Sequence, residues 1–215
     1  MSTSFRRSNR PPPLKQTVPS VWSSPSDTGI SVAWLTAPRV GESVSGDMVV
    51  VRHVEGHEAG LVGVIDALGH GPKAAVVADS SIDYLSRTPH ASVAGYMNGL
   101  HENLRGTRGA AALLFLVTAR GLAMCSVGNI ELRSSNTKLP FVLTPGVLGV
   151  RLRQPKVCEV PRATDRFVLY SDGISGRFDL KALSAHSPSE LAKHIFATHR
   201  RSHDDATVVV VDVSM

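Results

Sequence analysis

The sequence has few cysteines and no long apolar run, and these shortages exclude several classes of protein. The two cysteines, Cys125 and Cys158, lie in separate apolar stretches. This usage favours buried free thiols in a reducing cytoplasm, with a single disulfide as the alternative. No apolar run approaches the roughly 20 residues that cross a bilayer. A secretory signal has an apolar stretch after its positively charged start, and this sequence has none there. We therefore expect a cytoplasmic protein without a membrane partner.

Aromatic residues are also scarce, at 5% of the chain, although the net charge is +5. A basic protein can bind nucleic acid, but the stacking of bases requires aromatic side chains among the basic ones. Here the basic residues are spread along the chain, with small clusters at Arg6, Arg7 and Arg10 and at Arg200 and Arg201. We expect no nucleic-acid partner. A nucleic-acid adaptor that acts through the N-terminal segment is the alternative.

The composition is that of a globular protein, with 42% hydrophobic and 19% charged residues, and 215 residues suit one domain. Residues 1–28 are rich in Ser, Pro and Arg and lack apolar periodicity, which predicts a flexible tail. The folded domain is therefore expected over residues 29–215.

Runs of β-branched residues dominate that domain. The predicted strands are Ile30–Leu35, Met48–Val54, Leu61–Ile65, Ala110–Thr118, Leu122–Val127, Ile130–Ser134, Val147–Leu152, Phe167–Ser171 and Thr207–Val213. Short turns separate three of these runs, Ala110–Thr118, Leu122–Val127 and Ile130–Ser134, which are expected to form one antiparallel meander. Helices are predicted from Pro72, over Ser92–Arg105 and from about Pro188, because apolar residues recur there on one face. Many hairpins with a few helical blocks predict an α+β fold in layers.

Acidic residues stand at the ends of several predicted strands. Asp66 and Asp172 each end an apolar run, Asp204 and Asp205 precede the last strand, and Asp47 opens another. A single Asp at such a place can simply cap a turn. Carboxylates that meet at close range repel one another unless a cation neutralises them, and such hard oxygen ligands suit Mg²⁺ or Mn²⁺. Two such ions can activate a water and stabilise an in-line phosphoryl displacement.

The segments around these aspartates resemble a known family. The relevant segments are Ser45-Gly46-Asp47, Asp66-Ala67-Leu68-Gly69-His70-Gly71, Ser171-Asp172-Gly173 and Asp204-Asp205-Ala206-Thr207. In this order and spacing they are similar to the metal-dependent protein phosphatase (PPM) family, and within it to the bacterial SpoIIE-like branch of stress-response phosphatases. The resemblance covers about residues 41–213. It implies an αββα sandwich of two antiparallel sheets flanked by helices, with two divalent ions, Mn²⁺ or Mg²⁺, at one end.

The resemblance also implies a role for each acidic residue. Asp66 would bridge the two ions, and the carbonyl oxygen of Ala67 would help to hold one of them. Asp47 would bind the second ion, and Asp172 and Asp204 would bind the first. Asp205 would lie beside them, either as a further metal ligand or just outside the ligand set.

Two positions depart from the family pattern. Ala67 stands where the family usually has glycine, and a backbone that needs a positive φ there would be strained. Leu68 stands where larger relatives have a histidine that protonates the leaving group. His70 is then the candidate acid, and the alternative is an ordinary turn residue.

The function that the resemblance implies is hydrolysis of phosphoserine or phosphothreonine on a protein. The implied substrates are STAS-domain proteins of a stressosome-like complex in a stress or sigma-factor pathway. The alternative is a catalytically weak or inactive PPM-like module that only docks a signalling partner, for which Ala67 would be the sign of lost activity.

Overall fold

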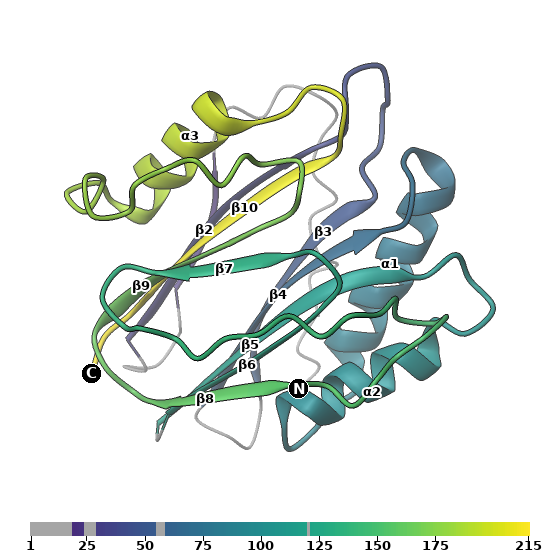
Figure 1. Ribbon diagram of the computed structural model, residues 1–215, viewed down its shortest axis with the longest axis horizontal. Helices are drawn as coiled ribbons and strands as arrows, with labels where there is room; N and C mark the ends of the chain where they lie inside the picture. Colours follow the sequence, from purple (N-terminus) through teal and green to yellow (C-terminus); the bar gives the residue numbers. More distant parts are fainter. Residues whose placement is uncertain (1–18, 24–28, 55–58, 120) are drawn as a thin grey trace, which may run out of the picture.

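The computed structural model describes residues 19–23, 29–54, 59–119 and 121–215, which form two antiparallel sheets packed face to face (Figure 1). Each sheet has five strands within these residues. The first sheet has the order β1 (Ser20–Ser23), β2 (Ile30–Ala37), β10 (Ala206–Val213), β9 (Asp165–Tyr170), β7 (Glu131–Ser134). The second has the order β3 (Asp47–Val54), β4 (Ala59–Ala67), β5 (Ala110–Thr118), β6 (Gly121–Val127), β8 (Val157–Pro161).

Helices cover the outer face of each sheet. α1 (Pro72–Arg87) and α2 (Val93–Asn103) pack on the second sheet, and α3 (Pro188–His199) packs on the first. Figure 1 shows α3 on the opposite side of the sandwich from α1 and α2. The predicted α+β architecture, an αββα sandwich, is therefore confirmed.

The helices begin where local sequence provides partners for their free N–H groups. Pro72 and Pro188 occupy first helical positions, where proline loses no hydrogen bond. The Ser92 side chain accepts a hydrogen bond from the N–H of Gly95 at the start of α2. The apolar face predicted for α1 consists of Ala75, Ala78, Ile82 and Leu85; the last three are buried and Ala75 is partly buried.

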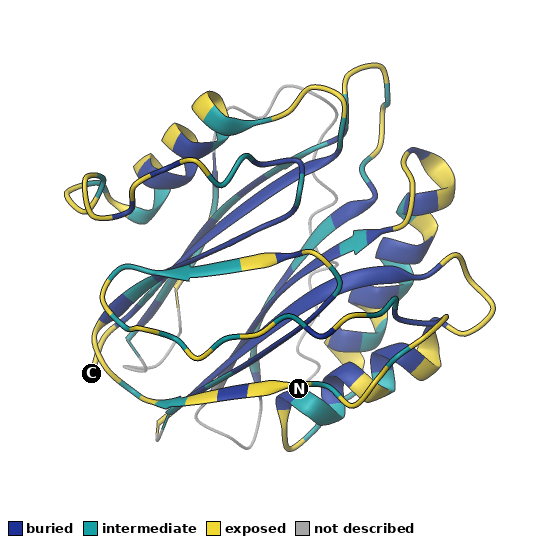
Figure 2. Cartoon of the chain, viewed as in Figure 1, coloured by how far each residue is buried: buried dark blue, intermediate teal, exposed yellow. Residues whose placement is uncertain are grey.

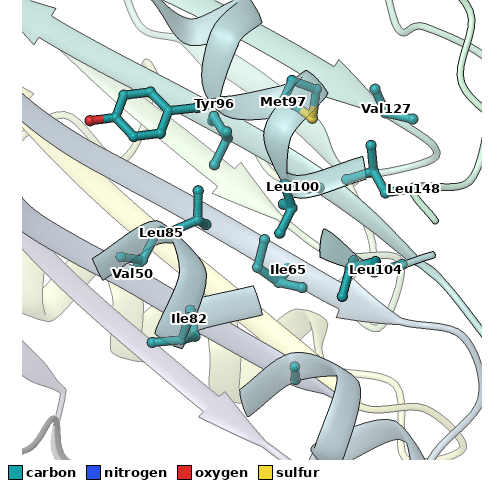
Figure 3. Close-up of a cluster of buried hydrophobic side chains, with 14 of the residues drawn as sticks. Val50, Ile65, Ile82, Leu85, Tyr96, Met97, Leu100, Leu104, Val127 and Leu148 are labelled. Carbon is teal, nitrogen blue, oxygen red and sulfur yellow. The ribbon is translucent and has the colours of Figure 1, made fainter. Parts of the chain in front are cut away.

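Buried apolar residues form three layers that match the architecture. Strands in Figure 2 are mostly dark blue, whereas the helices are yellow along their outer sides. Figure 3 shows the layer below α1 and α2, where Leu85 and Leu100 from the helices face Ile65 from β4. The layer between the sheets includes Phe115 of β5 and Phe167 of β9, with ring centroids 4.9 Å apart. The two sheets are therefore joined by direct apolar contact.

The predicted meander is wrong at its third strand. β5 and β6 pair as expected, but β7 pairs with β9 in the other sheet. The chain crosses between the sheets at Gly128, which has φ 97, a conformation that favours glycine. A side chain at Gly128 would place its Cβ 2.5 Å from the Cβ of Ala111. The apolar pattern predicts that β7 is a strand, but it does not predict which of the two sheets β7 joins.

The predicted strand Val147–Leu152 is also wrong. Val147 and Arg151 exchange main-chain hydrogen bonds around Gly149, which has φ 83, so the segment is a tight turn. The sequence prediction missed β8, an edge strand that ends in proline. It also missed β1, which lies in the expected tail of residues 1–28 and pairs with β2. Residues 1–18 and 24–28 of that tail lie outside the described residues.

The two cysteines are free and buried, as expected. They lie on neighbouring strands, β6 and β8, but Cys125 belongs to the layer below the helices and Cys158 to the layer between the sheets. Side chains on opposite faces of one sheet cannot reach each other, so the disulfide alternative is excluded. No helix within the described residues is long and apolar enough to cross a membrane.

The contact between the sheets leads to a stability prediction. Phe167→Ala should lower the free energy of unfolding by about 3–5 kcal/mol, because it leaves a cavity between two sheets that cannot easily close. Urea denaturation of the purified protein measures this. Val76→Ala is the matched control, because that side chain is 68% exposed on α1. A loss of less than about 1 kcal/mol for Phe167→Ala would contradict the assigned layer.

Candidate functional site

Two aspartates face each other across neighbouring strands at one end of the second sheet. Asp47 is the first residue of β3, Asp66 is the penultimate residue of β4, and the register makes them direct partners. Direct partners project from the same face of a sheet, with Cβ atoms about 4.5–5.5 Å apart. Asp47 is buried and Asp66 is partly buried. Two carboxylates are thus placed close together where water solvates them poorly.

The first sheet reaches the same place through Ser171, the residue that follows β9. Its hydroxyl donates a hydrogen bond to Oδ2 of Asp47 at 2.6 Å. The same Oγ accepts a hydrogen bond from the main-chain N–H of Thr207 in β10 at 3.0 Å. A buried hydroxyl therefore connects β9, β10 and β3, and fixes the orientation of the Asp47 carboxylate.

Asp172 and Asp204 lie at the adjoining end of the first sheet. Oδ2 of Asp172 accepts a hydrogen bond from Nδ2 of Asn129 at 2.6 Å, and Arg201 Nη1 donates to the main-chain oxygen of Asp172 at 2.9 Å. Asp204 accepts a bond from the N–H of Asp205 at 3.0 Å. Both carboxylates keep part of their surface exposed. They can therefore reach a ligand that enters from solvent.

Asp205 has a different environment from the other four aspartates. Its Oδ1 accepts the N–H of Arg39 at 2.8 Å, and its Oδ2 accepts the N–H of Gly46 at 2.6 Å. It thereby closes the loop of residues 38–46 between β2 and β3. Glycine is required at position 46, because a Cβ there would lie 2.7 Å from Ala74 Cβ and 3.1 Å from Asp205 Oδ2.

His70 lies on the turn after β4 and pairs with Glu42 of the loop of residues 38–46. Its Nδ1 is 2.8 Å from Oε1 of Glu42, and both side chains are partly exposed. His70 is also near enough to Asp205 to interact with it electrostatically. The candidate acid is thus at the site and is oriented by a carboxylate, which leaves its Nε2 available.

Comparison with known proteins gives no match to a protein-family model or to a curated protein. Solved structures do match. One comes from work on the bacterial stressosome, "a modular system that has been adapted to control secondary messenger signaling". It is 31% identical, has a TM-score of 0.78, and the match covers 85% of this chain and 98% of that one.

Two phosphatase structures share the fold. RsbX in complex with magnesium is 18% identical, with a TM-score of 0.76 over 91% of this chain and 100% of that one. The catalytic domain of the serine/threonine phosphatase PstP in complex with two manganese ions is 18% identical, with a TM-score of 0.67 over 86% of this chain and 99% of that one. The chain belongs to the metal-dependent protein phosphatase (PPM) family. The resemblance predicted from the four aspartate segments is therefore confirmed.

The carboxylates of this PPM chain interact strongly with one another. Burial, together with repulsion by Asp47, Asp172, Asp204 and Asp205, raises the pKa of Asp66 from 3.8 to about 9. Burial raises the pKa of Asp47 to about 7 against the opposing hydrogen bond from Ser171. The pKa values of Asp172 and Asp205 are also raised, first by burial and then by the charge of Asp204. The site therefore favours any species that removes negative charge, either a proton or a cation.

The carboxylates do not converge on one point. Within the described residues no three His, Cys, Asp or Glu side chains form a group that could hold a metal ion as arranged. Mutual repulsion opposes such an approach in the absence of positive charge. The donor set nevertheless fits a hard divalent cation in its chemistry, because it consists of carboxylate oxygens beside main-chain carbonyls.

Ala67 does not carry the strain that a positive φ would cause. It is the last residue of β4, pairs with Ala110 in extended conformation, and its side chain is fully buried. The chain instead turns at Gly69 and Gly71, with φ of 85 and 68. Leu68 is 41% exposed next to the aspartates and has no group that could transfer a proton. The departure at Ala67 is thus harmless to the fold.

The sequence prediction missed Ser171, Asn129 and Glu42 as partners of the site. The signal for Ser171 is its position directly before Asp172, which places it at the same strand end. No sequence signal joins Asn129 to Asp172 or Glu42 to His70, because these partners lie 43 and 28 residues apart in the chain.

The raised pKa of Asp66 leads to a prediction on stability. Folding raises this pKa from 3.8 to about 9, so the folded state holds the extra proton and stability falls as pH rises through this interval. Asp66→Asn removes the group that must take up this proton on folding, so it should raise the melting temperature in EDTA at pH 8 by at least about 2–4 °C. The difference should shrink toward pH 4.

Thermal denaturation at several pH values measures this difference. Asp83→Asn is the control, because that carboxylate lies in an exposed pair with Arg87. If Asp66→Asn melts no higher than the Asp83→Asn control at pH 8, the raised pKa assigned to Asp66 is contradicted.

Proposed function

We propose that this protein is a metal-dependent phosphatase that hydrolyses phosphoserine or phosphothreonine on a protein partner. The observation that carries the proposal is the electrostatic coupling of Asp66 to four further aspartates, which arrive from both sheets. A folded protein keeps such repulsion where a cation offsets it. Family membership supports phosphoester hydrolysis as the reaction.

The metal ligands we propose are Asp47, Asp66, Asp172 and Asp204, with the carbonyl oxygen of Ala67. Asp66 interacts with the four other aspartates of the site, and by the family resemblance it would contact both ions. When bound, two Mg²⁺ or Mn²⁺ ions would lower the pKa of a water molecule and neutralise the phosphoryl oxygens. RsbX and PstP, which carry magnesium and manganese respectively, support this choice of ions.

Asp205 has a separate role in this proposal. Its two oxygens already accept the N–H groups of Arg39 and Gly46. We therefore assign it to holding the loop of residues 38–46 next to the ligands, with its negative charge adding to the attraction for cations.

The chain's own residues also orient the reaction. Ser171 fixes the direction of the Asp47 carboxylate, and Asn129 fixes that of Asp172. His70 is assigned as the proton donor to the departing serine or threonine oxygen, because Glu42 accepts from its Nδ1–H and leaves Nε2 free to carry the proton. Serine alkoxide is a poor leaving group, so protonation matters for this substrate.

The partner we propose is a phosphorylated STAS-domain protein of a stressosome-like complex in the cytoplasm. The similarity to a stressosome-related structure and to RsbX supports it. The buried free thiols are compatible with a reducing compartment.

The central test is metal-dependent turnover. The wild-type protein with Mn²⁺ should hydrolyse p-nitrophenyl phosphate, and EDTA should abolish the reaction. Asp66→Asn and Asp172→Asn should each lower kcat by a factor on the order of 10² or more, because the water and the phosphoryl oxygens lose metal-derived charge stabilisation. Asp83→Asn should leave kcat unchanged. Wild-type turnover no greater than that of Asp66→Asn would favour the alternative, a module that binds a partner without catalysis.

The proton donor has its own test, which depends on the leaving group. p-Nitrophenolate leaves without protonation, whereas the serine oxygen does not. His70→Asn should therefore lower kcat for a phosphoserine peptide by about 10²-fold while kcat for p-nitrophenyl phosphate stays within about twofold. Glu42→Gln should show the same selectivity to a smaller extent. Equal losses on both substrates would mean that His70 supports the fold of the site and does not donate a proton.

A further inference from the structure

Hydrogen bonds along its length fix the loop of residues 38–46 beside the aspartates. The carboxylate of Asp205 binds the N–H groups of Arg39 and Gly46 at its two ends. In its middle, Glu42 pairs with His70 at 2.8 Å. The N–H of Val40 also donates to the main-chain oxygen of Ser202 at 3.0 Å. The loop, which projects from the upper right of Figure 1 between β2 and β3, is thus a preorganised surface.

This loop exposes two apolar side chains. Val40 is 68% exposed and Val44 is 39% exposed. Leu68, 41% exposed, lies on the neighbouring turn, which the Glu42–His70 pair connects to the loop. We call Val40, Val44 and Leu68 the apolar rim. Single exposed apolar residues need no explanation, but a group fixed beside a reaction site indicates a contact surface.

Exposed cationic side chains border the apolar rim. Arg108 donates to the main-chain oxygen of Leu68 at 3.0 Å, and Arg201 donates to that of Asp172 at 2.9 Å. Lys73 is exposed at the start of α1. It follows the segment of His70 and Gly71, which lies against Glu42. The partner surface complementary to this border combines apolar side chains with acidic ones.

We propose that the apolar rim is the docking surface for the folded phosphoprotein substrate, and this rests on the function proposed above. The substrate places apolar side chains on Val40, Val44 and Leu68 while its phosphoresidue reaches the aspartates. Acidic groups next to the phosphoresidue face Lys73, Arg108 and Arg201. A small phosphate ester does not touch the rim, so the rim distinguishes protein substrates from small ones.

The test compares substrates of different size. The double variant Val40→Ser/Val44→Ser should raise KM for a phosphorylated STAS-domain protein by about tenfold or more, the effect of losing about 1.4 kcal/mol of binding. Its kcat, and its kinetics with p-nitrophenyl phosphate and with a short phosphoserine peptide, should stay within about twofold of wild type. Val157→Ser is the matched control. This valine is 38% exposed on β8, and β8 and β3 are the two opposite edges of the second sheet.

The outcomes separate the two proposals. An unchanged KM of the double variant for the phosphoprotein would overturn the docking surface. An equal loss of activity on the phosphoprotein and on p-nitrophenyl phosphate would also overturn it, because it would mean damage to the reaction site itself. Absence of metal-dependent turnover in the wild type would overturn the function and not the rim. The docking surface would then be tested by equilibrium binding of the phosphorylated STAS-domain protein to the Asp66→Asn variant, with and without the two serine substitutions. Binding that is equally tight in both would contradict the docking surface.

The acidic character of the partner is tested separately. Lys73→Glu should weaken binding of the same phosphoprotein to the Asp66→Asn background, and the weakening should diminish at high salt. Binding unaffected by Lys73→Glu at low salt would contradict the acidic component of the partner surface.

Discussion

The repulsion among buried aspartates is the constraint on which the rest of this site depends. Five carboxylates interact at one end of the sandwich, and burial, together with the repulsion of the other four, raises the pKa of Asp66 to about 9. Such an arrangement persists only because the rest of the fold is stable enough to hold it. The apolar layers provide that stability: one joins the sheets through Phe115 and Phe167, and others lie below the helices.

Each carboxylate is fixed by a different part of the chain. Asp47 depends on Ser171, Asp172 on Asn129, and Asp205 on the loop that contains Arg39 and Gly46. The hydrogen bonds to Asp47 and Asp205 also oppose the effect of burial on their pKa values. Neutral hydrogen-bond donors therefore compensate part of the negative charge, and the remaining excess favours a proton or a cation.

The sequence predicted the strands with alternating or continuous apolar residues and the positions of the aspartates at their ends. It failed where the backbone conformation of one residue decides the path. Gly128 sends β7 into the other sheet, and Gly149 turns the apolar run from Val147 back on itself. It failed also for contacts between distant segments, such as Ser171 with Asp47 at a separation of 124 residues. Periodicity and motifs describe neighbours along the chain, whereas these contacts exist only once the sheets have packed.

The residues that depart from the family pattern fit one arrangement. Ala67 is extended and buried, so the missing glycine causes no strain in the strand that carries Asp66. Leu68 cannot donate a proton, and in the proposed function His70 takes that role because Glu42 orients it. The same Glu42 fixes the loop that exposes Val40 and Val44, and through His70 it connects this loop to the turn that carries Leu68. Proton donation and substrate docking would then both depend on the Glu42–His70 pair, because Glu42 orients the acid and also fixes the loop that carries Val40 and Val44.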